Sequence, residues 1–110
     1  MSAPREVLIL HTSDLHLGAD SILTDDDSGN VPVLEQVLST AREQQADLVI
    51  LAGDTFDHNR QGARLLEEVS EVMEGCGLPI VILPGNHDPL TPDSVYRRAE
   101  FTKAGNVHVL

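Results

Sequence analysis

Four short apolar runs, separated by more polar segments, constrain the fold of this chain more than any other feature. The runs are EVLILHTS (6–13), DLVILAG (47–53), LPIVILPG (78–85) and NVHVL (106–110). Each has the length and aliphatic content of a β-strand buried in a sheet. Valine and leucine dominate and only 3% of the residues are aromatic, a composition that suits strands covered on both faces.

The intervening segments carry helix signals. Residues 31–46 repeat apolar side chains at helical spacing after Asn30, a typical N-cap residue, and residues 62–74 do the same before a glycine-rich GCG sequence. Residues 91–101 are predicted to form a short helix capped at Thr91. This alternation of strand and helix predicts right-handed βαβ crossovers and a mostly parallel sheet, in a single α/β domain.

Composition restricts the environment of the chain. No apolar run approaches the roughly 20 residues that a membrane span needs, and the first ten residues lack the features of a signal peptide. The single cysteine, Cys76, excludes an internal disulfide and is typical of a reducing compartment, so we expect a cytoplasmic protein without membrane contact. The formal net charge of −11 disfavours non-specific attraction to nucleic acid, although carboxylates gathered at a metal site would contribute to that charge.

Ligand-type side chains follow the first three apolar runs. Because the carboxyl ends of parallel strands meet at one edge of a sheet, these side chains are expected to lie close together. Mixed carboxylate, imidazole and amide ligands suit Mn, Fe or Zn better than Mg or Ca. The residues concerned are Asp14 and His16 after the first run, Asp54, Asp57 and His58 after the second, and Asn86, His87 and Asp88 after the third.

Simpler explanations exist for each group taken alone. Asp14 and His16 would serve in a turn or at the surface, Asp54 as a helix cap, and Asn86 as a turn residue next to Gly85. Their recurrence at three successive strand ends argues for a shared site instead. Three histidines are assigned other roles. His11 and His108 lie within strands, and for His58 a surface role is favoured over an approach to the substrate.

The ordered set DLH, GDTFD and GNHD resembles the first three signature blocks of the calcineurin-like metallophosphoesterases. The resemblance implies two divalent metal ions, with Asp14 and His16 binding the first, Asp54 bridging both and Asn86 binding the second. It also implies that His87 faces the substrate phosphate and that Asp88 orients this histidine. The fold it implies is the N-terminal half of an αββα sandwich.

Within that superfamily, HTSDLHLG, GDTFD, GNHDP and NVHVL look most like the SbcD-type bacterial DNA repair exonucleases. That resemblance implies hydrolysis of DNA phosphodiester bonds, manganese as the metal (with Fe or Zn as alternatives) and a coiled-coil ATPase partner. Other phosphodiesterases and pyrophosphatases of the superfamily share similar blocks and stay open as an alternative.

The superfamily pattern continues with another histidine and a GHxH block, which this chain lacks after Asp88 apart from His108. We therefore expect residues 1–110 to be the N-terminal portion of a single, truncated domain that is inactive in isolation. A metal-binding module without turnover is the rival interpretation. A nucleotide-binding domain is disfavoured, because no glycine-rich phosphate loop is present. Sheet edges left open by a missing C-terminal half would be free to pair with a second copy of the chain.

Overall fold

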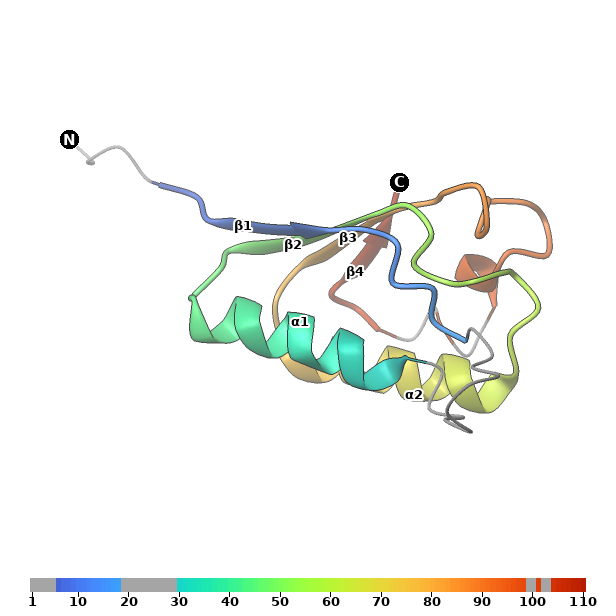
Figure 1. The fold of residues 1–110 in the computed structure, drawn as a ribbon, viewed down its shortest axis with the longest axis horizontal. Helices are drawn as coiled ribbons and strands as arrows, with labels where there is room; N and C mark the ends of the chain where they lie inside the picture. Colours follow the sequence, from blue (N-terminus) through green and yellow to red (C-terminus); the bar gives the residue numbers. More distant parts are fainter. Residues whose placement is uncertain (1–5, 19–29, 99–100, 102–103) are drawn as a thin grey trace.

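The computed structural model describes residues 6–18, 30–98, 101 and 104–110. Its strands form one parallel sheet in the order β1-β2-β3-β4, and the chain leaves β1, β2 and β3 at the same side (Figure 1). The predicted α/β fold with parallel strands is confirmed. The elements are β1 (Ile9–Thr12), α1 (Val31–Glu43), β2 (Leu48–Ala52), α2 (Ala63–Cys76), β3 (Ile80–Leu83), the 3₁₀ helix η1 (Val95–Arg97) and β4 (Val107–Val109).

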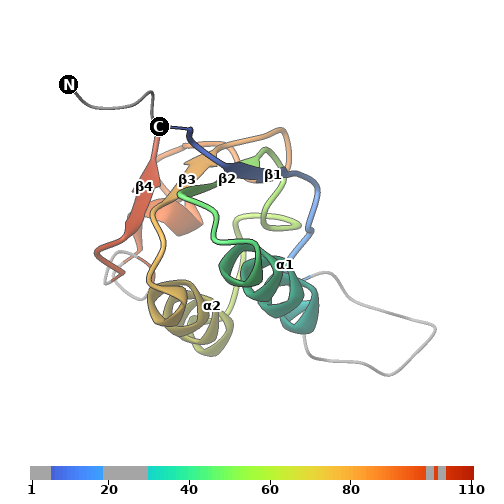
Figure 2. The same cartoon turned by 90° about the vertical axis from the view of Figure 1, so that its left-hand side faces the viewer.

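The hydrophobic core lies between the sheet and the two α-helices, which both pack on one face of it (Figure 2). Val49, Leu51, Ile80 and Ile82 are fully buried on that face. The helices contribute a stripe of buried side chains that includes Leu34, Leu38, Leu66 and Val69. Burial of each such aliphatic side chain contributes about 1.5–3 kcal/mol, so this layer anchors the strands whose ends carry the polar loops. Among the described helices, none is long and apolar enough to cross a membrane.

The other face of the sheet is not covered by α1 or α2. Strand order follows chain order, so right-handed crossovers deliver both helices to the same side. On the opposite face His11 is paired in register with Ile50, Ile50 with Val81, and Val81 with His108. Both histidines are exposed, and Ile9 keeps 46% of its surface accessible. Within the described residues, the composition-based expectation of strands covered on both faces is therefore wrong.

Asn30 precedes α1 as predicted, but its side chain does not cap the helix. It adopts a left-handed backbone conformation, with φ 64°. Its side-chain amide instead donates hydrogen bonds to the carbonyl oxygens of Leu15 and His16, at 3.4 and 3.2 Å. Asn30 thus ties the start of α1 to the loop that follows β1. That long-range partner explains why a local capping rule misassigns the side chain.

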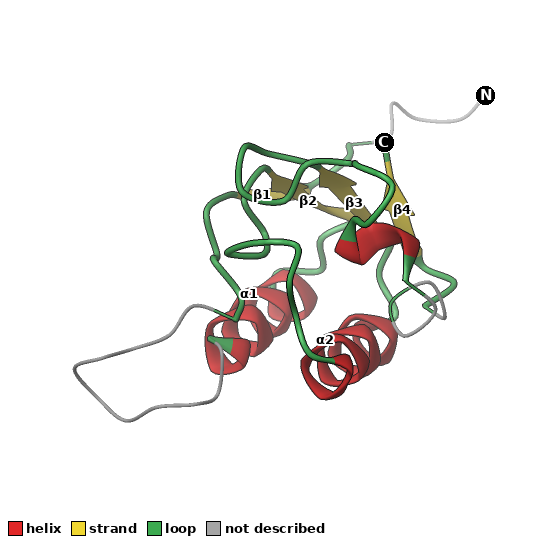
Figure 3. Ribbon diagram, turned by 90° about the vertical axis from the view of Figure 1, so that its right-hand side faces the viewer, coloured by secondary structure: helices red, strands yellow, loops and turns green. Residues whose placement is uncertain are grey.

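Of the helix predicted over residues 91–101, the described residues form a single turn, η1, which lies beside the loops that follow the strands (Figure 3); residues 99 and 100 lie outside the described part. The cap of η1 is Ser94, whose hydroxyl accepts a hydrogen bond from the N–H of Tyr96 at 3.1 Å. The predicted cap, Thr91, instead donates to the Asp93 carboxylate at 2.7 Å. The polar loop predicted from Thr24 lies, up to residue 29, outside the described residues.

Candidate metal centre

The loops that follow β1 and β2 run side by side and are joined by backbone hydrogen bonds. The N–H of His16 donates to the carbonyl of Asp54 at 3.1 Å, and the N–H of Leu17 donates to that of Thr55 at 2.8 Å. The N–H of Asp57 returns to the carbonyl of Leu17 at 2.9 Å. Parallel pairing therefore continues beyond the strand ends, and it brings the acidic and imidazole side chains of both loops together.

Three of the four predicted metal ligands meet at this point. Asp14, His16 and Asp54 each offer a ligand atom, and these atoms all lie within 4.8 Å of one another. The Nε2 atom of His16 is 3.8 Å from a carboxylate oxygen of Asp14. Asn86, the fourth predicted ligand, is exposed in the loop after β3. Among the described residues, its side chain makes no hydrogen bond to the other three.

The same three clustered residues have left-handed backbones. Their φ angles are 56° at Asp14, 49° at His16 and 52° at Asp54. This region is unfavourable for residues other than glycine, with a cost of about 1–3 kcal/mol at each position. Such strain persists only where the surrounding structure enforces it, and it is typical of functional sites.

The surroundings of the Asp54 carboxylate favour its ionised form. The backbone N–H of His87 donates to it at 2.8 Å, and this hydrogen bond is the main reason that the pKa of Asp54 lies below its ordinary value of 3.8. The nearby His87 and His16 rings lower the pKa further, against the opposing effect of burial. Asp54 is thus ionised at neutral pH, which is the state that a metal ligand requires.

Gly85 permits this contact between the loops. A Cβ atom at this position would lie 2.5 Å from both the backbone nitrogen and a carboxylate oxygen of Asp54. Any side chain would therefore push the loop after β3 away from the loop after β2. The absence of a side chain lets the N–H of His87, two residues later, reach the Asp54 carboxylate.

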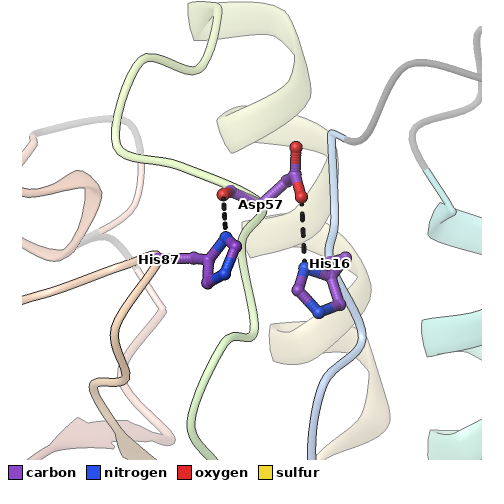
Figure 4. Close-up of side chains that lie close together, drawn as sticks. All are labelled: His16, Asp57 and His87. Atoms are coloured by element: carbon purple, nitrogen blue, oxygen red, sulfur yellow. Dashed lines mark hydrogen bonds and ion pairs between the residues drawn. The ribbon is translucent and has the colours of Figure 1, made fainter.

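A second cluster consists of His16, Asp57 and His87 (Figure 4). A carboxylate oxygen of Asp57 lies 3.1 Å from Nδ1 of His16, and the Asp57 carbonyl lies 3.2 Å from Nδ1 of His87. The two imidazole rings are perpendicular, with their centroids 5.1 Å apart. Asp57 occupies Nδ1 of His16 and leaves Nε2 on the side of Asp14, which is the usual arrangement of a carboxylate behind a metal-binding histidine.

Asp88 is fully buried and binds the backbone of the loops that follow β2 and β3. Its carboxylate accepts hydrogen bonds from the N–H groups of Gly85, Phe56 and Asp54, at 2.7, 3.1 and 3.2 Å, and from the hydroxyl of Tyr96. The resemblance implies that Asp88 orients the His87 ring. Among the described contacts, however, that ring meets Asp57, and Asp88 acts on the main chain.

The family model for calcineurin-like phosphoesterases matches residues 7–109. The chain belongs to the calcineurin-like phosphoesterase family. The match extends over all the described strands and helices, and the family assignment made from the three signature blocks is confirmed.

Relatives of this calcineurin-like phosphoesterase are named as one of the subunits of the nuclease SbcCD. The protein from Bacillus subtilis is 30% identical over 106 residues, which cover 93% of this chain and 27% of the relative. The protein from Escherichia coli K12 is 39% identical over 83 residues, covering 73% of this chain and 21% of the relative. The matched part is thus about a quarter of the length of these relatives. The crystal structure of TT1561 from Thermus thermophilus has the same fold, with a TM-score of 0.54 at 22% identity over 73% of this chain and 30% of that one.

The donor set of the calcineurin-like phosphoesterase chain fits divalent metal ions. Ionised carboxylates and a histidine held through its second nitrogen are the ligands that Mn, Fe and Zn accept. Sequence reasoning placed Asp57 among the ligand-type side chains but gave it no role, although the spacing of the two acids in GDTFD was an available signal. His58 is exposed and accepts a hydrogen bond from the N–H of Arg60 at 3.0 Å, which fits its surface assignment.

Proposed function

We propose that residues 1–110 are the N-terminal portion of a single metallophosphoesterase domain that hydrolyses phosphodiester bonds of DNA at a dinuclear metal site. The observation that carries the proposal is the cluster of Asp14, His16 and Asp54, whose ligand atoms lie within 4.8 Å of one another. In the proposed site Asp14 and His16 bind the first ion, Asp54 bridges both, and Asn86 binds the second.

Two dications held in this way would supply a nucleophilic water and would neutralise the charge of the phosphate. The protein's own contribution begins with Asp57, which orients His16 through Nδ1. His87 contributes at two points. Its N–H orients the Asp54 carboxylate, and its exposed ring is available to stabilise charge on a phosphoryl or leaving-group oxygen.

A nucleic acid is the proposed substrate class because relatives that are 30% and 39% identical are named as subunits of a nuclease, and the resemblance to DNA repair exonucleases favours DNA. Those names also describe one component of an assembly, which supports a protein partner. Following the resemblance, we propose a coiled-coil ATPase as that partner and manganese as the metal. The buried, free Cys76 fits a cytoplasmic location.

The main alternative is another phosphodiesterase or a pyrophosphatase of the same family, because the clustered ligands serve any phosphate ester. A metal-binding module without turnover is the second alternative for the isolated 110 residues. It is favoured by the small share of the relatives' length that the chain matches, since further ligands can lie in the rest of such a protein.

The test is to purify the full-length protein, titrate it with Mn²⁺ and assay bis-p-nitrophenyl phosphate, linear duplex DNA and a nucleoside diphosphate conjugate. We expect Mn²⁺ binding and cleavage of both diesters. Asp54→Asn should remove binding and turnover together. Asp93→Asn makes the same chemical change on an exposed carboxylate outside the site and should alter neither. Cleavage of the nucleoside diphosphate conjugate alone would favour a pyrophosphatase, and metal binding without turnover would favour the module.

A further inference from the structure

A buried carboxylate with four hydrogen-bond donors connects the loops of the proposed metal site. An ionised aspartate offers about four acceptor positions. At Asp88 three of these are taken by backbone N–H groups, from Asp54, Phe56 and Gly85, and the fourth by the hydroxyl of Tyr96. Tyr96 is therefore the side-chain donor in this set. It is also the one donor of the four that lies outside the loops after β2 and β3, because it belongs to η1.

The position of the Asp54 carboxylate depends on this arrangement through a closed circuit of hydrogen bonds. The N–H groups of Asp54 and Gly85 share one oxygen of Asp88, at 3.2 and 2.7 Å. From Gly85 the chain continues to His87, whose N–H returns to the Asp54 side chain at 2.8 Å. If the Asp88 carboxylate rotated, the left-handed backbone at Asp54 would lose a hydrogen bond that holds it, and the returning N–H would shift.

Tyr96 is well placed to prevent that rotation. Its side chain is almost fully buried, with 5% of its surface exposed. Its ring meets the rings of Phe56 and Phe101 edge-on, at centroid distances of 5.8 and 5.5 Å. Burial, followed by the contact with Asp88, raises the pKa of the Tyr96 hydroxyl far above its ordinary value, so this hydroxyl is a donor at neutral pH.

We propose that Tyr96 is a positioning residue of the metal centre: its hydroxyl locks the Asp88 carboxylate, and Asp88 in turn fixes the loops that present Asp54 and His87. The consequence for metal binding rests on the proposed function, whereas the locking of the loops does not. Tyr96 touches neither the clustered ligands nor a substrate. It acts on Asp88 through its hydroxyl. The effect of the hydroxyl can therefore be separated from that of the ring by substitution.

The test compares the full-length protein with two variants. Tyr96→Phe removes the hydroxyl and keeps the ring. Phe101→Leu is the matched control, because it loosens the same aromatic cluster and leaves the hydroxyl in place. Amide hydrogen exchange of Asp54, Phe56 and Gly85 is measured by NMR in the metal-free protein. Mn²⁺ affinity is then measured by titration, and global stability by urea unfolding.

For Tyr96→Phe we expect exchange at these three amides to become roughly tenfold faster, as follows from weakening hydrogen bonds to a charged group. Mn²⁺ affinity should also fall, by at most about the 10–100-fold that follows the loss of a direct partner of a metal ligand, because Tyr96 acts one contact further away. Phe101→Leu should lower global stability and leave the affinity within about twofold of wild type, since the lock is intact.

Wild-type exchange at the three amides in Tyr96→Phe would overturn the proposal. So would equal acceleration of these amides in Phe101→Leu, because packing and not the hydroxyl would then fix the loops. If the wild-type protein binds no Mn²⁺, the proposed function fails, but the exchange data still decide whether Tyr96 locks Asp88. Unchanged affinity together with faster exchange would overturn the link from Tyr96 to the metal centre and leave the proposed function standing.

Discussion

The main chain of His87 holds the side chain of Asp54: the N–H of the first residue donates to the carboxylate of the second at 2.8 Å. The ring of the same histidine points elsewhere and contacts the carbonyl of Asp57. One residue thus acts on the site twice, through two independent groups. Substitution of the side chain removes only one of these actions, so the two can be measured apart.

His87→Ala should leave the metal ions bound and slow the reaction. The alanine variant keeps the N–H that orients Asp54 and loses the ring that is proposed to face phosphate. We expect wild-type metal content and a loss of about 10²–10⁴ in rate. Metal analysis and single-turnover kinetics measure the two effects, with Asp54→Asn as the comparison that should lose its metal. If His87→Ala loses metal to the same extent, then His87 is a ligand and its assignment to phosphate is wrong.

Gly85→Ala should damage both stability and metal binding. The added Cβ would lie 2.5 Å from two atoms of Asp54, and overpacking of this kind usually costs about 1–3 kcal/mol. Gly75→Ala is the matched control, because a Cβ there meets nothing within 4 Å and lies in helix α2, where alanine is favoured by about 0.5–1 kcal/mol. In urea unfolding, the free energy of unfolding should be lower than wild type for Gly85→Ala and higher for Gly75→Ala. Equal stability of both would mean that the loops are not packed as closely as described.

Asp57→Asn should weaken metal binding without abolishing it. The carboxylate of Asp57 holds Nδ1 of His16 at 3.1 Å, and losing the anion behind a metal-binding histidine typically lowers affinity by about 10–100-fold. Mn²⁺ titration measures the effect, with Asp93→Asn again as the surface control. An affinity equal to that of wild type would remove Asp57 from the site, and complete loss would make it a direct ligand.

Alkaline titration of residues 1–110 should reveal the protected hydroxyl of Tyr96, which is the only tyrosine in this sequence. Burial, then Asp88, raises its pKa above the ordinary 10.0, so above pH 10 the folded state binds a proton that the unfolded state has lost. The stabilisation from this group is complete below pH 10 and is lost as the pH rises further. Tyrosinate absorbance should therefore appear together with unfolding. Its appearance near pH 10 in a folded protein would contradict the buried contact with Asp88.

Sequence reasoning works well here where a feature is local or follows from topology. The apolar runs and the helical spacing between them predict a parallel sheet, and the parallel sheet predicts that Asp14 and Asp54 meet at one edge. Both steps use general rules about strand connections. The α-helices end within three residues of the predicted positions because their signals are local, and Gly77, the second glycine of GCG, ends α2 in a left-handed conformation at φ 72°.

The features that escape prediction depend on partners far away in the chain. Asn30 bonds to carbonyls 14 and 15 residues before it, so its side chain is not available as a cap. Asp88 takes its donors from residues 32 and 34 positions away as well as from nearby Gly85. The carboxylate of Asp57 is linked to the site by its contact with His16, 41 residues earlier. Periodicity and capping rules contain no information about such pairs.

The left-handed backbones of Asp14, His16 and Asp54 have an evolutionary consequence. Glycine adopts these φ angles with little strain, so at each position the residue best for the backbone differs from the residue best for the proposed site. A lineage that no longer needed metal would gain stability by drifting toward glycine there, and one under selection for activity would retain the strained acid or histidine. A mutational scan of folding stability alone should therefore find unusually tolerant glycine substitutions at positions 14, 16 and 54, as at Asn30 and Gln45, whose φ angles are also positive.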